Sequence, residues 1–327
     1  MDEPSRRRFL GLAAALAAPP QLARAQGAEG WPASRPVRIV VGFAAGGGVD
    51  ITARLIGQWL GSRLGAAVVI ENRPGADGNI GTEVVVNAPA DGYTLLLAAQ
   101  PNAVNAALYP RLGFNFMRDI APVAGIIRMP MVVLVHPSVP ATTIPALIAH
   151  AKANPDRINM ASAGTGSAPH MAGELFDTMA GVRMVHVPYR GQGPALSDLI
   201  GGQVDVMFAA AAGTADYIRT GKLRALAVTA QSAAETLRDL PTVGDFVTGY
   251  RAEQWYGLAA PKATPAAIVG RLNAETNAAF ADAAMKARFA DIGGEPLPGS
   301  AADFERLVAE ETSKWAEVIA AAGIRVE

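Results

Sequence analysis

The sequence predicts an α/β protein built from two domains, and three observations support this. Short runs of β-branched residues alternate with helical stretches along most of the chain. Half of the 327 residues are hydrophobic and 17% are charged, a composition that supplies a sizeable core. A chain of this length exceeds what a single hydrophobic core usually holds, which favours two domains.

The N-terminal residues predict a removable export signal. Ser5-Arg6-Arg7-Arg8-Phe9-Leu10 resembles the twin-arginine signal, and an uncharged apolar stretch, Pro19-Pro20 and the small-x-small site Ala23-Arg24-Ala25 follow it. The apolar stretch is about half of the roughly 20 residues that span a bilayer. We therefore expect a signal peptide over residues 1–25, cleavage after Ala25 and a soluble periplasmic protein exported by the twin-arginine route. The alternative is a disordered basic tail or an uncleaved anchor.

Composition argues against several classes of function. Removal of residues 1–25 leaves 24 basic and 27 acidic side chains, a net charge of −3. No basic run is present that would bind nucleic acid, and no long apolar segment would enter a membrane. Because the sequence has no cysteine, disulfides, thiol catalysis and thiolate-bound metal centres are ruled out. Stability must therefore come from packing.

The predicted elements follow one another in a regular order. Val37–Val41 is a strand by composition, and after a glycine-rich loop Asp50 would cap a helix whose buried face carries Ile51, Leu55, Trp59 and Leu60. Further strands are expected at 68–70, 94–97, 132–135, 158–160, 184–187, 204–208 and 223–228, and helices at 144–152, 171–179 and 195–200. Several of these strands are apolar on both faces, which suits a parallel sheet covered by helices. The tail predicts three amphipathic helices, at 265–281, 283–292 and 301–322, with no strand between them.

Four loops that follow predicted strands are rich in glycine, small hydroxyls and amides. They span residues 43–50, 98–102, 161–170 and 188–194. In open α/β sheets, ligands bind beyond the carboxyl ends of the strands. Glycines let the backbone approach a ligand, and the free amides at a helix N-terminus attract an anion. The loops together predict an anion receptor, although each one alone is equally consistent with an ordinary tight turn.

Motifs for catalysis are missing. The first loop lacks the glycine spacing of a dinucleotide site, residues 164–167 lack the lysine of a phosphate-binding loop, and Ser167 has no glycine two residues later. The four histidines share no short metal-ligand spacing, and of these His170 is the one expected near a ligand. Asp50 fits the role of a general base, but a helix N-cap explains it as well. With these motifs missing, we predict no cofactor, no metal and no catalytic residue.

Several ordered segments carry a family resemblance. The resembling segments are residues 36–43 with Gly46, Gly47 and Asp50, and residues 71–76, 90–95, 189–195, 201–205, 221–229, 240–243 and 255–261. The chain resembles the Bug-type (TctC-like) solute receptors of tripartite tricarboxylate transporters over essentially the whole mature sequence. One departure concerns the first loop, where family members often have two prolines after the phenylalanine and this chain has Ala44 and Ala45.

The resemblance implies a two-lobed fold similar to type II periplasmic binding proteins, with a hinge of two crossing strands and a central cleft. The chain would cross between lobes near residues 126–133 and return near 254–258. Domain 1 would then comprise residues 26–128 plus 254–327, including the C-terminal helices, and domain 2 would comprise residues 129–253.

The same resemblance implies a solute-binding receptor that is not an enzyme. It would hold a small carboxylate through loop amides, hydroxyls and waters and deliver it to the large and small membrane subunits of a transporter, as a monomer that binds no nucleic acid. The expected ligand-binding residues are Phe43, Ala44, Ala45, Gly46, Gly47, Asp50, Gln100, Asn102, Ser162, Thr165, Gly166, Ser167, His170, Tyr189 and Gly191. Two alternatives stay open: a ligand-binding partner of a signalling receptor, and a periplasmic hydrolase or isomerase with Asp50 or His170 as acid/base.

Overall fold

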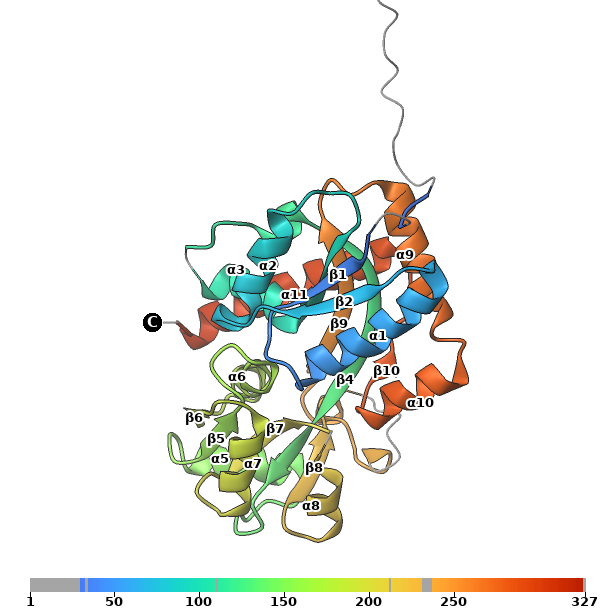
Figure 1. Cartoon of the computed structure of the whole chain (residues 1–327). Coiled ribbons are helices and arrows are strands. Elements are labelled where there is room, and N and C mark those ends of the chain that lie inside the picture. The colour runs from blue at the N-terminus through green and yellow to red at the C-terminus, as the bar shows by residue number, and fades with distance from the viewer. Residues whose placement is uncertain (1–29, 33–34, 110, 212, 231–236, 326–327) are drawn as a thin grey trace, which may run out of the picture.

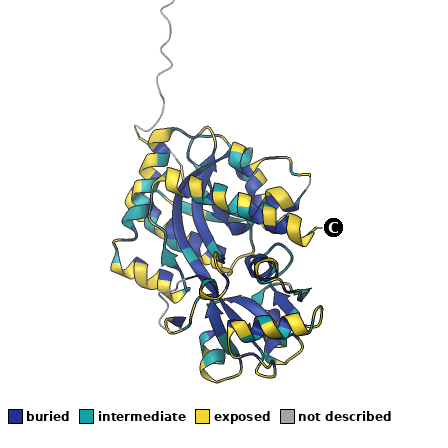
Figure 2. Ribbon diagram, turned by 180° about the vertical axis from the view of Figure 1, so that it is seen from behind, coloured by how far each residue is buried: buried dark blue, intermediate teal, exposed yellow. Residues whose placement is uncertain are grey.

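The fold is α/β, as predicted, with two lobes that share one long strand (Figure 1). The computed structural model describes residues 30–32, 35–109, 111–211, 213–230 and 237–325. The predicted signal peptide and its cleavage site at Ala25 lie outside the described residues. Buried strands form the centre of each lobe, and the helices around them expose their outer faces (Figure 2).

The first lobe is a sheet with helices on both faces. Strands β1 (Val37–Val41), β2 (Val68–Asn72) and β3 (Thr94–Ala99) are parallel, while β9 (Glu253–Pro261) runs antiparallel between β3 and β4 (Ile120–Val135). Alternate residues of β1 serve different cores: Ile39 packs with helix α1, whereas Val40 packs with the C-terminal helix. The helices of this lobe are α1 (Gly48–Leu64), α2 (Asn79–Val86), α3 (Gln100–Leu108), α4 (Phe116–Asp119), α9 (Ala266–Ala278), α10 (Ala283–Asp291) and α11 (Ala301–Ala322).

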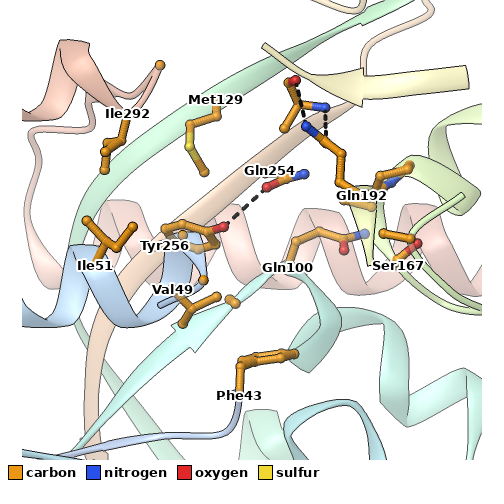
Figure 3. Close-up of a pocket in the computed structure, with 18 of the residues that line it drawn as sticks. Phe43, Val49, Ile51, Gln100, Met129, Ser167, Gln192, Gln254, Tyr256 and Ile292 are labelled. Carbon is orange, nitrogen blue, oxygen red and sulfur yellow. Dashed lines mark hydrogen bonds between the residues drawn. The ribbon is translucent and has the colours of Figure 1, made fainter. Parts of the chain in front are cut away.

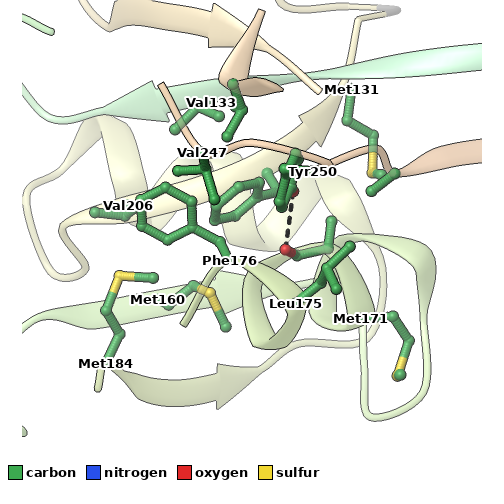
Figure 4. Packing of buried hydrophobic residues seen from close by; sticks show 14 of the residues in the cluster. Met131, Val133, Met160, Met171, Leu175, Phe176, Met184, Val206, Val247 and Tyr250 are labelled. Carbon is green, nitrogen blue, oxygen red and sulfur yellow. Dashed lines mark hydrogen bonds between the residues drawn. The ribbon is translucent and has the colours of Figure 1, made fainter. Parts of the chain in front are cut away.

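The second lobe has its own sheet and core. Strand β5 (Asn159–Ser162) lies parallel between β6 (Val185–Pro188) and β7 (Val206–Ala210), and β8 (Arg224–Val228) pairs with β4. In its core Phe176 packs edge-on against Tyr250, whose hydroxyl donates to the Ala172 carbonyl at 2.9 Å (Figure 4). The helices of this lobe are α5 (Ile144–Ala153), α6 (Ala168–Ala180), α7 (Gln192–Ile200) and α8 (Ala215–Arg219).

Strand β4 joins the two sheets. Residues Ile120 to Pro130 pair with β9 of the first lobe, and residues Met131 to Val135 pair with β7 and β8 of the second. The return segment runs beside it, because the Ala252 amide donates to the Thr229 carbonyl one residue before β9 begins. The loops at the ends of both sheets therefore face each other across this pair of connections.

The C-terminal helix α11 makes a second contact between the lobes. Its residues Trp315, Val318 and Ile319 belong to the same buried cluster as Met171 and Leu175 of α6. Helix α11 therefore lies against the second lobe as well as covering the first (Figure 1).

The predicted helix cap at Asp50 is wrong. Helix α1 begins at Gly48 with Gly47 as its N-cap, and Asp50 lies inside the first turn, where its carboxylate accepts from the Gly46 amide at 2.9 Å. The predicted buried face of this helix also differs. Ile51 is 37% exposed, Leu55 and Trp59 are only partly buried, and the fully buried apolar side chains are Ala53, Ile56 and Leu60.

The prediction of a strand-free tail is also wrong. A two-residue strand, β10 (Glu295–Pro296), lies between α10 and α11 and pairs antiparallel with Ile127 and Arg128 of β4. A pairing this short leaves no periodic pattern in the sequence, since it depends on the neighbouring strand rather than on local composition.

Candidate functional site

A cavity of about 470 Å³ lies between the two lobes (Figure 3). The first lobe contributes the loop after β1, the start of α3, residues of β4 and β9 and the end of α10, and the second lobe contributes the starts of α6 and α7 and the end of β7. The lining residues are Phe43, Gly47, Gly48, Val49, Ile51, Ala99, Gln100, Pro101, Met129, Ala163, Ser167, Ala168, Pro169, Gln192, Ala210, Ala211, Gln254, Tyr256, Asp291, Ile292 and Gly293.

Four helices begin at this cavity. The N-cap of α1 is Gly47, that of α3 is Ala99 and that of α6 is Ser167, while α7 begins at Gln192; all four residues line the cavity. The first amides of a helix have no carbonyl partner within the helix, and the helix dipole places positive partial charge there. Because α1 and α3 belong to one lobe and α6 and α7 to the other, both lobes direct such groups at one space.

The charge of an anion in this cavity would be met by backbone rather than by basic side chains. Among the described residues that line it, none is Lys, Arg or His, and Asp291 is the one charged side chain. Phosphate and carboxylate groups are bound in this way at the N-termini of helices in many proteins.

Gln100 is the buried polar side chain of the described lining that makes no hydrogen bond to the protein. It is 1% exposed, and neither its amide oxygen nor its amide nitrogen makes a hydrogen bond within the described protein. The other polar side chains nearby are already engaged: Gln192 bonds both the amide and the carbonyl of Ala210, and the Ser167 hydroxyl donates to the Gly164 carbonyl at 2.6 Å. A buried amide left without a partner is costly, so Gln100 is suited to a ligand.

Tyr256 and Gln254 form a hydrogen-bonded pair on β9. The Tyr256 hydroxyl donates to the Gln254 amide oxygen at 3.2 Å, and burial raises the pKa of Tyr256 well above its usual value, so the hydroxyl stays protonated. The ring reaches the start of α1, where a Cβ on Gly48 would lie 3.0 Å from the Tyr256 hydroxyl oxygen. Glycine at this position lets the ring lie directly against the helix N-terminus.

Asp50 holds the first loop in place. Its carboxylate accepts from the Gly46 amide, from the Arg54 guanidinium at 2.9 and 3.0 Å and from the Asn72 amide at 2.9 Å. Burial by itself raises the pKa of Asp50, but these hydrogen bonds outweigh it and leave the pKa below its usual value. Asp50 is thus ionised, and its carboxylate is occupied by hydrogen bonds within the protein. Its role is structural: it fixes the loop that carries Gly47 of the cavity lining.

A histidine pair supports the loop of the second lobe from behind. The ring of His170 stacks on that of His186 with centroids 3.7 Å apart, and His170 Nδ1 accepts from the Gly166 amide at 3.0 Å. His170 Nε2 lies 3.2 Å from Glu174, and His186 Nε2 lies 2.6 Å from the Ser162 hydroxyl. Burial, with a smaller contribution from His170, lowers the pKa of His186 to about 3, so its ring is neutral at ordinary pH.

The structure brings together part of the predicted residue set. Phe43, Gly47, Gln100 and Ser167 line the cavity. Ala44, Ala45 and Gly46 are exposed on the same loop, and Asn102 is buried against the Ala99 amide and Thr82. The remaining predicted residues lie outside the cavity lining: Asp50, Ser162, Thr165, Gly166, His170, Tyr189 and Gly191.

Sequence reasoning missed most of the apolar lining. Val49, Ile51 and Gln192 lie within or next to the predicted loops, so extending each loop by one residue would have included all three. Met129, Gln254 and Tyr256 come from the crossing strands, and Ile292 comes from the end of a tail helix. No local motif marks these four residues, because only the arrangement of the lobes brings them to the cavity.

Residues 52–324 match the model of the tripartite tricarboxylate transporter family receptor, TctC. The chain belongs to this family. It is 36% identical over 316 residues to a UPF0065 protein in the tcbD-tcbE intergenic region of Pseudomonas sp. strain P51, covering 96% of this chain and 94% of that one. It is 33% identical over 325 residues to Protein BugT of Bordetella pertussis, covering 98% and 99%. The predicted Bug-type resemblance is therefore confirmed.

Solved structures agree with this assignment. R. palustris Rpa4515 with adipate superposes with a TM-score of 0.79 at 36% identity, covering 90% of this chain and 99% of that chain. MatC (Rpa3494) from Rhodopseudomonas palustris with bound malate superposes with a TM-score of 0.74 at 32% identity, covering 88% and 99%. Periplasmic solute-binding receptors are thus the proteins this fold resembles. Within the described residues, no helix combines the length and apolar character needed to cross a membrane.

Proposed function

We propose that this protein captures a small organic carboxylate in the cavity between its lobes and delivers it to the membrane subunits of a tripartite tricarboxylate-type transporter. The observation that carries the proposal is the meeting of four helix N-termini from both lobes at one cavity without a basic side chain in its described lining. The adipate held by Rpa4515 and the malate held by MatC give the expected ligand class.

Delivery requires that the liganded form differ from the empty one. Residues 26–128 with 254–327 would move as one body and residues 129–253 as the other, about the paired connections at Pro130 and Ala252. A ligand that touches both lobes favours the closed state, since it binds that state better than the open one. The protein acts as a monomer in the periplasm, exported through the twin-arginine route, and performs no catalysis.

Thermal unfolding across a panel of carboxylates tests the binding proposal. A ligand present at about 100 times its Kd stabilises the native state by about 2.7 kcal/mol, which for a chain of this size raises Tm by roughly 5 °C. The matched neutral amide of each acid is the control and should shift Tm far less. A panel of mono-, di- and tricarboxylic acids in which none raises Tm more than its amide would refute the proposal.

Transport and export need separate experiments. Deleting the gene should abolish uptake of the labelled ligand, and restoring the protein should recover it; loss of a transcriptional response with normal uptake would instead favour the signalling alternative. Replacing both Arg6 and Arg7 with lysine should leave the protein in the cytoplasmic fraction if the twin-arginine route is used. Normal periplasmic recovery of that variant would contradict this route.

A further inference from the structure

The cavity has two chemically different ends. Gln100, Ser167 and Gln192 lie together on one side, and Ile51, Met129 and Ile292 lie on the other (Figure 3). The first group stands at the starts of helices α3, α6 and α7, and the second group comes from α1, β4 and the end of α10. We call these the amide end and the apolar end of the cavity.

The amide end is prepared for one anionic group. Three helix N-termini with positive partial charge meet there, and the amide of Gln100, 1% exposed, is left without a hydrogen-bond partner in the described protein. A carboxylate would accept from the Gln100 amide nitrogen and from main-chain N–H groups, and such charge-assisted bonds are shorter and stronger than neutral ones.

The apolar end is unsuited to a second anionic group, because the ionised Asp50 offsets the positive partial charge of the first turn of α1, which carries Ile51. Its described lining offers aliphatic side chains and a thioether, and it ends at the C-terminus of α10, where carbonyl groups place negative partial charge. Asp291, the one charged side chain of the described lining, stands at that same terminus and would repel another carboxylate. A charge buried against Ile51 and Met129 would also lose its hydration without a partner.

We infer that the ligand is an amphipathic monocarboxylic acid, with its carboxylate at the amide end and an uncharged apolar body against Ile51, Met129 and Ile292. This inference rests on the proposed function and narrows its ligand class. It separates this chain from the similar Rpa4515 and MatC structures, which hold the dicarboxylates adipate and malate.

Two acids with six-carbon chains test the inference by isothermal titration calorimetry: hexanoate and adipate. Hexanoate should bind more tightly, and adipate should bind at least about tenfold more weakly because its second carboxylate would be buried without a partner. From butyrate to hexanoate, each added methylene should tighten binding by about fourfold. Equal or tighter binding of adipate, or no dependence on chain length, would overturn the inference.

Failure of the inference is distinguishable from failure of the proposed function. If malate or adipate binds and hexanoate does not, the receptor function stands and the ligand assignment is wrong. If no acid of any class binds, both are wrong.

Charge placed at the apolar end should reverse the preference. Ile51→Lys introduces a cation on a side chain that is 37% exposed, and it should raise the affinity for adipate relative to hexanoate by about tenfold or more. Val69→Lys, on the 50%-exposed Val69 of strand β2 and outside the cavity lining, is the matched control and should leave the ratio unchanged.

Ile292→Lys repeats the test from a second position, at the C-cap of α10, where a cation also suits the helix terminus. An unchanged adipate-to-hexanoate ratio in both folded variants would overturn the placement of the apolar end.

Discussion

Replacing Gln100 with methionine separates the stability of the cavity from its binding function. Methionine keeps the length of the side chain and removes two buried polar atoms that have no partner in the described protein. An unsatisfied buried polar group costs about 1–3 kcal/mol. We therefore expect Gln100→Met to raise the free energy of unfolding of the ligand-free protein, at the lower end of that range because the cavity can rearrange around the amide.

The same substitution should weaken binding of the ligand. A hydrogen bond to a charged group contributes about 1.5–3 kcal/mol, which corresponds to a loss of roughly 10- to 100-fold in affinity. Denaturant unfolding without ligand measures the first effect, and titration with hexanoate measures the second. Opposite signs in the two measurements identify a residue retained for binding at the expense of stability.

Gln203→Met supplies the control. Gln203 is exposed, bonds weakly to the Gly201 carbonyl at 3.4 Å and lies away from the cavity, so neither stability nor affinity should change by more than a few tenths of a kcal/mol. Destabilisation of ligand-free Gln100→Met together with unchanged hexanoate affinity would refute the reasoning, because Gln100 would then be a structural residue.

Three further substitutions probe the framework around the cavity. Burial raises the pKa of Asp177 to about 7, above its usual 3.8, so the native state keeps a proton that the unfolded chain loses, and stability falls as pH rises from about 4 to 7. Asp177→Asn should therefore have a higher free energy of unfolding than the parent at pH 8, by about 2–4 kcal/mol, and the gain should vanish near pH 4. Thermal unfolding at both pH values measures this, and an equal gain at both would contradict this origin. Gly257→Ala would place a Cβ 2.1 Å from the Phe304 ring, so it should lower the free energy of unfolding by about 3 kcal/mol, and an unchanged denaturation midpoint would show that the ring moves freely. Asp50→Ala removes the hydrogen bond to the Gly46 amide and so releases the loop that carries it. It should lower the free energy of unfolding by about 2–3 kcal/mol and weaken hexanoate binding. Undiminished affinity would exclude Asp50 as the residue that positions the loop.

The position of the cavity could be predicted because the ends of the strands can be recognised in the sequence. Each of the four predicted loops follows a predicted strand, and parallel strands bring their carboxyl ends to one edge. Phe43, Gln100 and Ser167 were found in this way: Phe43 lies on the loop before α1, and Gln100 and Ser167 stand at the starts of α3 and α6. The backbone supplies the chemistry there, so the pattern of glycines was more informative than any single polar side chain.

The apolar end could not be predicted, because its residues share no segment. Met129 faces the cavity only because β4 continues from one sheet into the other, and Ile292 does so only because α10 packs beside α1. His170 was predicted to lie near a ligand because it follows a glycine loop, and the structure places it outside the cavity lining. The residue is 2% exposed, and its Nδ1 accepts from the Gly166 amide and so supports this loop.

A crystal structure with 6-bromohexanoate tests the central claim most directly, because the anomalous signal of bromine locates one end of the ligand and the density locates the other. We expect the carboxylate within hydrogen-bond distance of Gln100 and of main-chain amides from both lobes, and the bromine beside Ile51 and Met129. A ligand that contacts one lobe alone, or whose carboxylate lies beside Asp291, would contradict the claim.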